Sequence, residues 1–240
     1  MSRSNLVQQT VTVGLALVAC LQPARSIAQV NASGSKSVKG SADFLKADAQ
    51  DAQHWRDMKF GLFVHWGPIS LKGANISWTR GGERRGWRGT GNIPVEIYDN
   101  LYKEFNPVKF NAEEWVQMAK DAGMKYVVFG CKHHDGFCMF DNKLTDYKIT
   151  NSPFKRDVLK ELADACHKAG LGMGCYYSLP DWHHPDYRTE NHQRYLEYLN
   201  GQLREICSNY GQIDIIWWDG LGGTAKDWDS QKLFRMIRQL

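Results

Sequence analysis

The sequence predicts an α/β fold built on a (β/α)8 TIM-like barrel, which is incomplete in this 240-residue chain. Short apolar runs alternate with amphipathic stretches, as in a parallel sheet that is covered by helices. Polar residues follow the apolar runs directly, where barrel enzymes build their active sites. No Gly-x-Gly-x-x-Gly follows the first run, so the alternative of a dinucleotide-binding doubly wound sheet has no support.

The expected elements follow in order. Four apolar runs are predicted to be strands buried on both faces: 60–66, 126–131, 172–177 and 213–217. Three helical patterns each end before a glycine, the residue that best adopts a left-handed cap: 112–122, 155–169 and 190–210. A further helix is expected over 230–240. About four strand–helix units result, whereas a whole barrel takes about 250 residues.

The N-terminal segment predicts export. Residues 1–28 combine one basic residue, an apolar run and a small-residue cleavage site, as in a signal peptide of a secreted or periplasmic protein. The alternative is a lipoprotein in which Cys20 carries a lipid anchor. Residues 29–50 are expected to be a linker or disordered arm, and 51–240 the partial barrel, which is the catalytic domain.

Composition excludes one broad class of function. The chain has 30 basic and 26 acidic residues, and removal of residues 1–28 takes away two arginines and no acid, so the net charge falls from +4 to +2. Such a charge does not suit a general nucleic-acid binder. Five cysteines remain after residue 28, without a Cys-x-x-Cys pair, and we expect buried thiols.

Asp219 is the first candidate for chemistry. It precedes Gly220 in the segment Ile213–Gly220, where a buried run containing Trp217 and Trp218 meets a glycine turn. In a barrel, this position presents the carboxylate into the mouth. An Asp that caps the next turn is the alternative, since Asp-Gly is common in turns.

Three histidines also lie at the ends of predicted strands. His65 lies at the end of the first strand, and His133 and His134 come after the second. Because adjacent strand residues point to opposite faces, one of the pair is expected to face the pocket and the other its wall. Their imidazoles suit hydrogen bonds to sugar hydroxyls, and metal binding is the alternative.

Four segments in order resemble the motifs of family 29 glycoside hydrolases, the alpha-L-fucosidases: 60–67, 132–137, 176–182 and 217–220. The resemblance implies a retaining exo-glycosidase that needs no cofactor or metal and acts on a fucosylated oligosaccharide or polysaccharide. It implies that Asp219 is the nucleophile of a double displacement. It also implies substrate-binding roles for several residues: His65, Trp78, His133, His134, Tyr177 and Trp217.

Two departures from that family stand out. Many members have Glu-Trp where this chain has Ser77-Trp78, so one carboxylate that would bind the sugar is missing. No residue after Asp219 matches the general acid/base, and that role is left empty.

A Gly-rich loop after the first strand carries Arg80, Arg84, Arg85 and Arg88. Arginine forks bind sulfate or carboxylate, so the glycan is hypothesised to be anionic; the alternative is a solvated loop whose arginines pair with nearby acids. Two functional alternatives also stand: a metal-dependent barrel hydrolase that uses His65, His133, His134 and Asp219, and a glycan-binding protein without turnover.

Overall fold

The computed structural model describes residues 18–19, 46–220 and 222–240. Its sheet contains four parallel strands in chain order: β2 (Gly61–Val64), β3 (Tyr126–Lys132), β4 (Gly172–Ser178) and β5 (Ile215–Asp219). The two-residue strand β1 (Val18–Ala19) pairs antiparallel with β5. The four predicted strands are therefore confirmed, with their ends within two residues of the expected positions.

Six α-helices lie in the described part of the chain: α1 (Ala49–Met58), α2 (Val95–Tyr98), α3 (Ala112–Asp121), α4 (Val158–Ala169), α5 (His192–Asn209) and α6 (Ser230–Ile237). Short 3-10 turns cover Pro68–Lys72, Leu101–Lys103 and Ile149–Asn151. Helices α3 to α6 correspond to the four predicted ones. None of the helices described is long and apolar enough to cross a membrane.

Local capping explains where the helices begin and end. The side chains of Asn111 and Asp157 accept backbone N–H groups in the first turns of α3 and α4. Gly123, Gly170 and Gly211 follow α3, α4 and α5 with φ of +79°, +72° and +73°, a conformation that other residues rarely adopt. The predicted glycine ends are thus confirmed.

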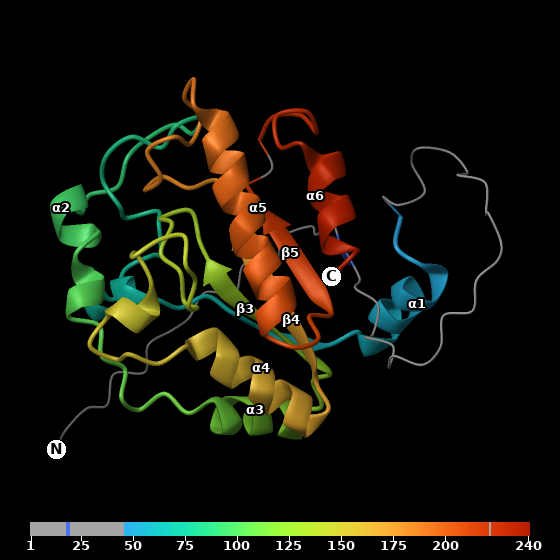
Figure 1. The fold of residues 1–240 in the computed structure, drawn as a ribbon. Coiled ribbons are helices and arrows are strands. Elements are labelled where there is room, and N and C mark those ends of the chain that lie inside the picture. Colours follow the sequence, from blue (N-terminus) through green and yellow to red (C-terminus); the bar gives the residue numbers. More distant parts are fainter. Residues whose placement is uncertain (1–17, 20–45, 221) are drawn as a thin grey trace, which may run out of the picture.

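The sheet has two different faces. On the helix face, the strands pack against α3, α4 and α5 in the main hydrophobic core (Figure 1). On the opposite face, here called the inner face, a smaller cluster joins Val128, Tyr176 and Ile215 to Met58 of α1. Half-buried Phe63 and Trp217 pack against this cluster. In a closed barrel the inner face is the one that surrounds the axis.

Predictions for the N-terminal region remain predictions. Apart from residues 18–19, the signal peptide (1–28) and most of the linker (29–50) lie outside the described residues, as does Cys20. Helix α1 begins at Ala49, two residues before the expected start of the globular part. The remaining five cysteines are buried free thiols, as expected.

Candidate active site

Asp219 is the last residue of β5, and its carboxylate is held from two sides. The Tyr176 hydroxyl donates to Oδ2 at 2.6 Å, and the backbone N–H of Gly220 donates to Oδ1 at 2.6 Å. The side chain is nevertheless 47% exposed. Asp219 therefore accepts a hydrogen bond within the turn and still offers its carboxylate to a ligand. The role as a turn cap and the role in chemistry are compatible.

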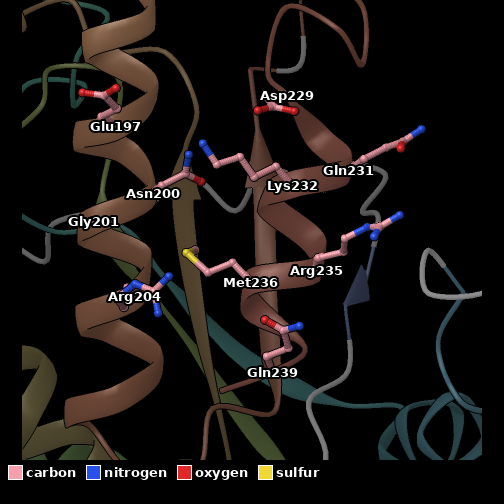
Figure 2. A pocket seen from close by; sticks show the side chains of 10 residues that line it. All are labelled: Glu197, Asn200, Gly201, Arg204, Asp229, Gln231, Lys232, Arg235, Met236 and Gln239. Atoms are coloured by element: carbon pink, nitrogen blue, oxygen red, sulfur yellow. The ribbon is translucent and has the colours of Figure 1, made fainter.

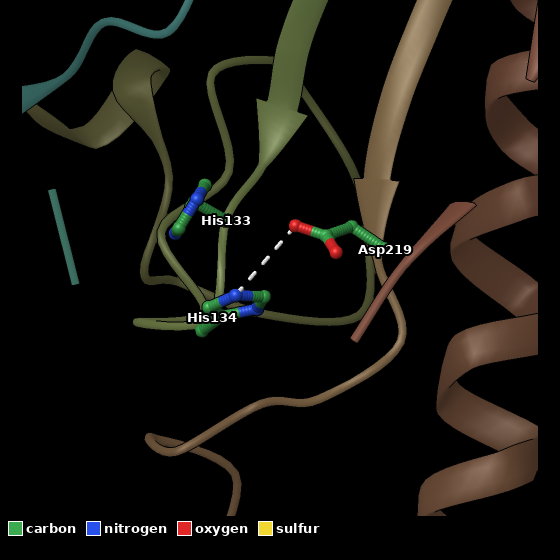
Figure 3. Close-up of side chains that lie close together, drawn as sticks. All are labelled: His133, His134 and Asp219. Carbon is green, nitrogen blue, oxygen red and sulfur yellow. Dashed lines mark ion pairs between the residues drawn. The ribbon is translucent and has the colours of Figure 1, made fainter. Parts of the chain in front are cut away.

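His133 and His134 lie beside this carboxylate. Their ring centroids are 4.2 Å apart, and one ring nitrogen of each lies within 4.8 Å of an Asp219 oxygen and of the other (Figure 3). Strand β3 ends at Lys132, so the strict alternation of a strand does not apply to them. The expectation that one histidine would face the pocket and the other its wall was wrong, because both join the cluster.

Both histidines are neutral near pH 7. Burial lowers the pKa of His134 to about 4 although the Asp219 charge acts to raise it, and burial holds the pKa of His133 well below its usual value. The contact of 3.7 Å between His134 Nε2 and Asp219 Oδ2 is therefore not an ion pair at that pH. A neutral imidazole offers one donor and one acceptor, which suits sugar hydroxyls.

His65 completes the group from the neighbouring strand. Its ring lies 4.3 Å from that of Tyr176 and 5.0 Å from that of His133, measured between centroids. A Cβ at Gly130 would come within 2.8 Å of His65 Nδ1, so the glycine in β3 makes room for this imidazole. Burial also lowers the pKa of His65 to about 4 against the pull of Asp219.

The prediction that Tyr177 lines the sugar pocket needs correction. Tyr177 is fully buried on the helix face, where its hydroxyl donates to Gln202 Oε1 at 2.6 Å. Tyr176 occupies the inner face and reaches Asp219 instead. Successive residues of a strand point to opposite faces, so the two tyrosines cannot share a role.

Three tryptophan rings lie around His134. Trp78 lies 5.3 Å from the His134 ring and Trp87 stacks on it at 5.9 Å, while Trp182 lies 5.1 Å away. Trp78 and Trp87 keep 41% and 38% of their surfaces exposed. Trp217 lies on the inner face, 4.9 Å from Phe63. Exposed tryptophans beside polar groups suit the apolar face of a sugar ring.

The arginines of the Gly-rich loop mainly hold the loop itself. Arg80 makes a two-pronged contact with Asp99 at 2.7 and 2.6 Å, and Arg84 donates to the carbonyl of Trp78. Arg85 donates to three carbonyls of the segment 184–187, at 3.1, 2.6 and 2.7 Å. These bonds engage one guanidinium nitrogen of Arg84 and one of Arg85 within the protein. Binding of an anionic glycan by this loop stays a prediction.

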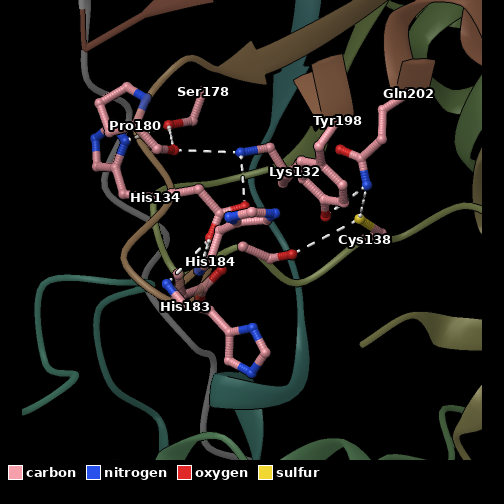
Figure 4. A network of polar contacts seen from close by, with 12 residues as sticks. Lys132, His134, Cys138, Ser178, Pro180, His183, His184, Tyr198 and Gln202 are labelled. Carbon is pink, nitrogen blue, oxygen red and sulfur yellow. Dashed lines mark hydrogen bonds and ion pairs between the residues drawn. The ribbon is translucent and has the colours of Figure 1, made fainter. Parts of the chain in front are cut away.

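A buried ion pair supports the site from behind. Lys132 Nζ lies 3.3 Å from Asp181 Oδ2, with side-chain exposures of 0% and 2%, and it also donates to the carbonyl of Pro180 (Figure 4). Asp181 Oδ1 accepts the N–H groups of His183 and His184. This network fixes the loop after β4, and sequence analysis did not assign it a role.

A groove lies away from this group of residues. Its volume is about 660 Å³, and it lies between α5 and α6, lined by polar residues such as Glu197, Arg204 and Lys232 (Figure 2). No strand-end residue takes part in it. The chemistry instead gathers at the carboxyl ends of β2 to β5, as in barrel enzymes.

Comparison with known proteins identifies the family. The sequence profile of the alpha-L-fucosidases matches residues 27–240. The chain belongs to the alpha-L-fucosidase family. It is similar to alpha-L-fucosidase 1 of Arabidopsis thaliana, with 31% identity over 90% of this chain and 40% of that protein.

Solved fucosidase structures agree with the fold. Alpha-L-fucosidase isoenzyme 1 from Paenibacillus thiaminolyticus shares 41% identity and a TM-score of 0.69, over 80% of this chain and 48% of that one. A family 29 fucosidase from Bacteroides thetaiotaomicron, trapped as a covalent intermediate with 2-fluoro-fucosyl fluoride, shares 32% identity and a TM-score of 0.66, over 80% and 47%. The predicted barrel fold is confirmed, and this chain spans less than half the length of these relatives.

Proposed function

We propose that the chain carries the nucleophile side of a retaining alpha-L-fucosidase site. The observation that carries this proposal is the half-exposed carboxylate of Asp219 at the end of β5, fixed by Tyr176 and Gly220 beside two neutral histidines. The covalent intermediate trapped in the Bacteroides relative supports a double displacement. A fucosylated glycan is the proposed substrate.

The proposed reaction has two steps. An Asp219 oxygen attacks the anomeric carbon, the bond from that carbon to the leaving oxygen breaks, and the leaving oxygen takes a proton from a general acid. Water then attacks the glycosyl ester, gives a proton to the same residue and frees Asp219. The buried carboxyl groups of Asp135 and Asp181 already accept hydrogen bonds inside the protein, so the general acid/base role stays unassigned.

Hydrolysis of an aryl alpha-L-fucoside tests the proposal. We expect Asp219→Gly to abolish turnover and added azide to restore it, because the small anion replaces the missing nucleophile. Asp227→Ala, at an exposed carboxylate of the same region, serves as the control and keeps the parent rate. Unchanged turnover in Asp219→Gly contradicts the nucleophile, and binding of fucose without turnover in the parent favours a glycan-binding protein.

A finer proposal concerns an anionic leaving group. Arg80, Arg84 and Arg85 form hydrogen bonds within the protein, whereas Arg88 is exposed. Arg88 is therefore proposed to bind the sulfate or carboxylate group of a sulfated or uronate-bearing glycan. Arg88→Gln is expected to slow turnover of an anionic glycan and not of its neutral counterpart. An unchanged ratio of the two rates removes the proposal.

Export is also proposed, on the sequence pattern of residues 1–28. Mass spectrometry of the mature chain from its secreting host tests it. A chain that begins at Gln29 supports the signal peptide, a lipid on Cys20 supports the lipoprotein alternative, and an intact Met1 contradicts both.

A further inference from the structure

The hydroxyl of Ser178 determines which nitrogen of His134 carries hydrogen. Ser178 Oγ lies 2.6 Å from His134 Nδ1 and 2.7 Å from the carbonyl oxygen of Pro180. A carbonyl accepts hydrogen bonds and cannot donate, so the single hydroxyl hydrogen of Ser178 goes to Pro180. His134 Nδ1 must then be the donor to Ser178. In a neutral imidazole this leaves Nε2 with a lone pair and no hydrogen.

The contact between His134 and Asp219 agrees with this assignment. His134 Nε2 lies 3.7 Å from Asp219 Oδ2, which is beyond hydrogen-bond distance. An N–H group that faces a carboxylate usually approaches to about 2.7–2.9 Å. Two acceptors that face each other stay apart, as observed, and a donor hydroxyl from a ligand satisfies either one.

Ser77 fixes the other histidine in the opposite way. Its Oγ accepts the backbone N–H of Asp135 at 2.9 Å and lies 2.6 Å from His133 Nδ1. Ser77 is fully buried, so its hydroxyl hydrogen is not given to solvent. Within the described residues, His133 Nδ1 is the acceptor available to it. Ser77 therefore donates to Nδ1, and the hydrogen of His133 is on Nε2.

The backbone of Ser77 has an unusual conformation that a hydrogen bond stabilises. Its φ of +58° is rare for a residue with a side chain, and its N–H donates to the Tyr98 hydroxyl at 2.7 Å. That hydroxyl donates in turn to Asp135 Oδ2 at 2.7 Å. Strained backbone that its surroundings hold in place is characteristic of functional sites.

We propose that Ser77 and Ser178 are positioning residues that impose opposite tautomers on the two adjacent histidines. His133 then presents a hydrogen-bond donor to a ligand and His134 an acceptor, side by side next to Asp219 (Figure 3). A sugar hydroxyl at His133 then accepts a hydrogen bond, and one at His134 donates its hydrogen. The tautomers follow from the contacts alone, whereas their use in sugar recognition rests on the proposed function.

Nuclear magnetic resonance of the chain labelled with ¹⁵N in its histidine rings tests the proposal. Two-bond ¹H–¹⁵N correlations at neutral pH distinguish a ring nitrogen that carries hydrogen from one that does not. The His133→Gln and His134→Gln variants assign the two sets of signals by their loss. We expect hydrogen on Nδ1 of His134 and on Nε2 of His133.

Serine variants connect each tautomer to its cause. Ser178→Ala is expected to shift the His134 signals towards the other tautomer and to leave those of His133 in place. Ser77→Gly, which keeps the left-handed backbone, is expected to shift the His133 signals towards the other tautomer and to leave those of His134 in place. Ser152→Ala is the matched control, because this buried serine donates to the Ile149 carbonyl and touches neither histidine.

The same tautomer on both histidines of the parent chain overturns the proposal, even if no variant folds. Unchanged signals in folded Ser178→Ala and Ser77→Gly overturn it as well. Titration of the labelled parent with L-fucose separates the two proposals. Signals that do not respond to fucose contradict the proposed function, but they leave the tautomers as measured.

Discussion

Tyr176 donates its hydroxyl hydrogen to Asp219 Oδ2 at 2.6 Å, from the adjacent strand and from the same face of the sheet. A hydrogen bond to a charged group contributes about 1.5–3 kcal/mol. In a double displacement this donor holds the carboxylate in position for attack and stabilises its charge when the glycosyl ester breaks down.

Replacing Tyr176 by Phe is therefore expected to lower kcat/KM for an aryl fucoside by about 10- to 100-fold, the equivalent of that energy. The ring packing remains, so the thermal midpoint changes little. Tyr177→Phe is the matched control: it removes a hydroxyl that bonds Gln202 on the helix face, and it lowers stability without changing kcat/KM. Equal rate losses in both variants would argue against a direct role of Tyr176.

Gly130→Ala is expected to displace His65, because the new Cβ would lie 2.8 Å from His65 Nδ1. We predict a fall in kcat/KM of at least about tenfold, or about 1.4 kcal/mol of transition-state binding. Gly67→Ala is the control, since its Cβ meets only Ile76 at an ordinary 3.6 Å and its backbone is extended. Steady-state kinetics measures kcat/KM of both variants. An unchanged kcat/KM in Gly130→Ala would exclude a role for His65.

Breaking the buried pair of Lys132 and Asp181 is predicted to cost stability. Asp181→Asn leaves an ammonium group buried without its anion, and such a loss costs about 3–5 kcal/mol. Urea unfolding measures it. Asp164→Asn, which breaks an exposed pair with Lys160, is expected to change the free energy of unfolding by less than about 1 kcal/mol. Similar small losses in both variants would contradict a supporting role for the buried pair.

Stability is predicted to rise with pH between about 4 and 6.5. Burial lowers the pKa of His65 and His134 to about 4 against opposition from Asp219, whereas the unfolded chain has values near 6.5. In that window the unfolded state binds more protons, so acid favours unfolding by up to about 1.4 kcal/mol per pH unit for each histidine. The contribution is complete above pH 6.5.

Urea unfolding at several pH values across this window measures the slope. His134→Gln is expected to reduce it, and His54→Gln, at an exposed position of α1, is expected to leave it unchanged. A free energy of unfolding that does not vary across the window would show that the two imidazoles are not buried in neutral form.

Part of this site was predictable from residue order alone. Asp219 ends a buried run before a glycine, and that pattern located the carboxylate correctly at a strand end. The choice between Tyr176 and Tyr177 was not predictable in the same way. β4 is buried on both faces, so its composition does not distinguish the inner face from the helix face, and only the pairing of Tyr176 with Trp217 does.

The roles of polar side chains in loops were harder to predict. The directions of Arg84 and Arg85 depend on carbonyls of residues 78 and 184–187, and loop sequence does not reveal such contacts. In the sequence, Ser77 stands out only because many family members have a glutamate at that position. Its hydrogen bond to His133 spans 56 positions and requires a left-handed backbone, neither of which has a local sequence signal.

The contact of Arg85 with the loop after β4 limits how the sequence of this site can evolve or be engineered. One guanidinium nitrogen of Arg85 joins the loop after β2 to three backbone carbonyls of the loop after β4, those of residues 184, 185 and 187, and backbone carbonyls remain whatever residue is placed there. Side-chain substitutions at residues 184, 185 and 187 therefore leave this contact in place, whereas insertions or deletions in either loop break the register between them. A transfer of specificity from another enzyme would have to exchange the two loops together.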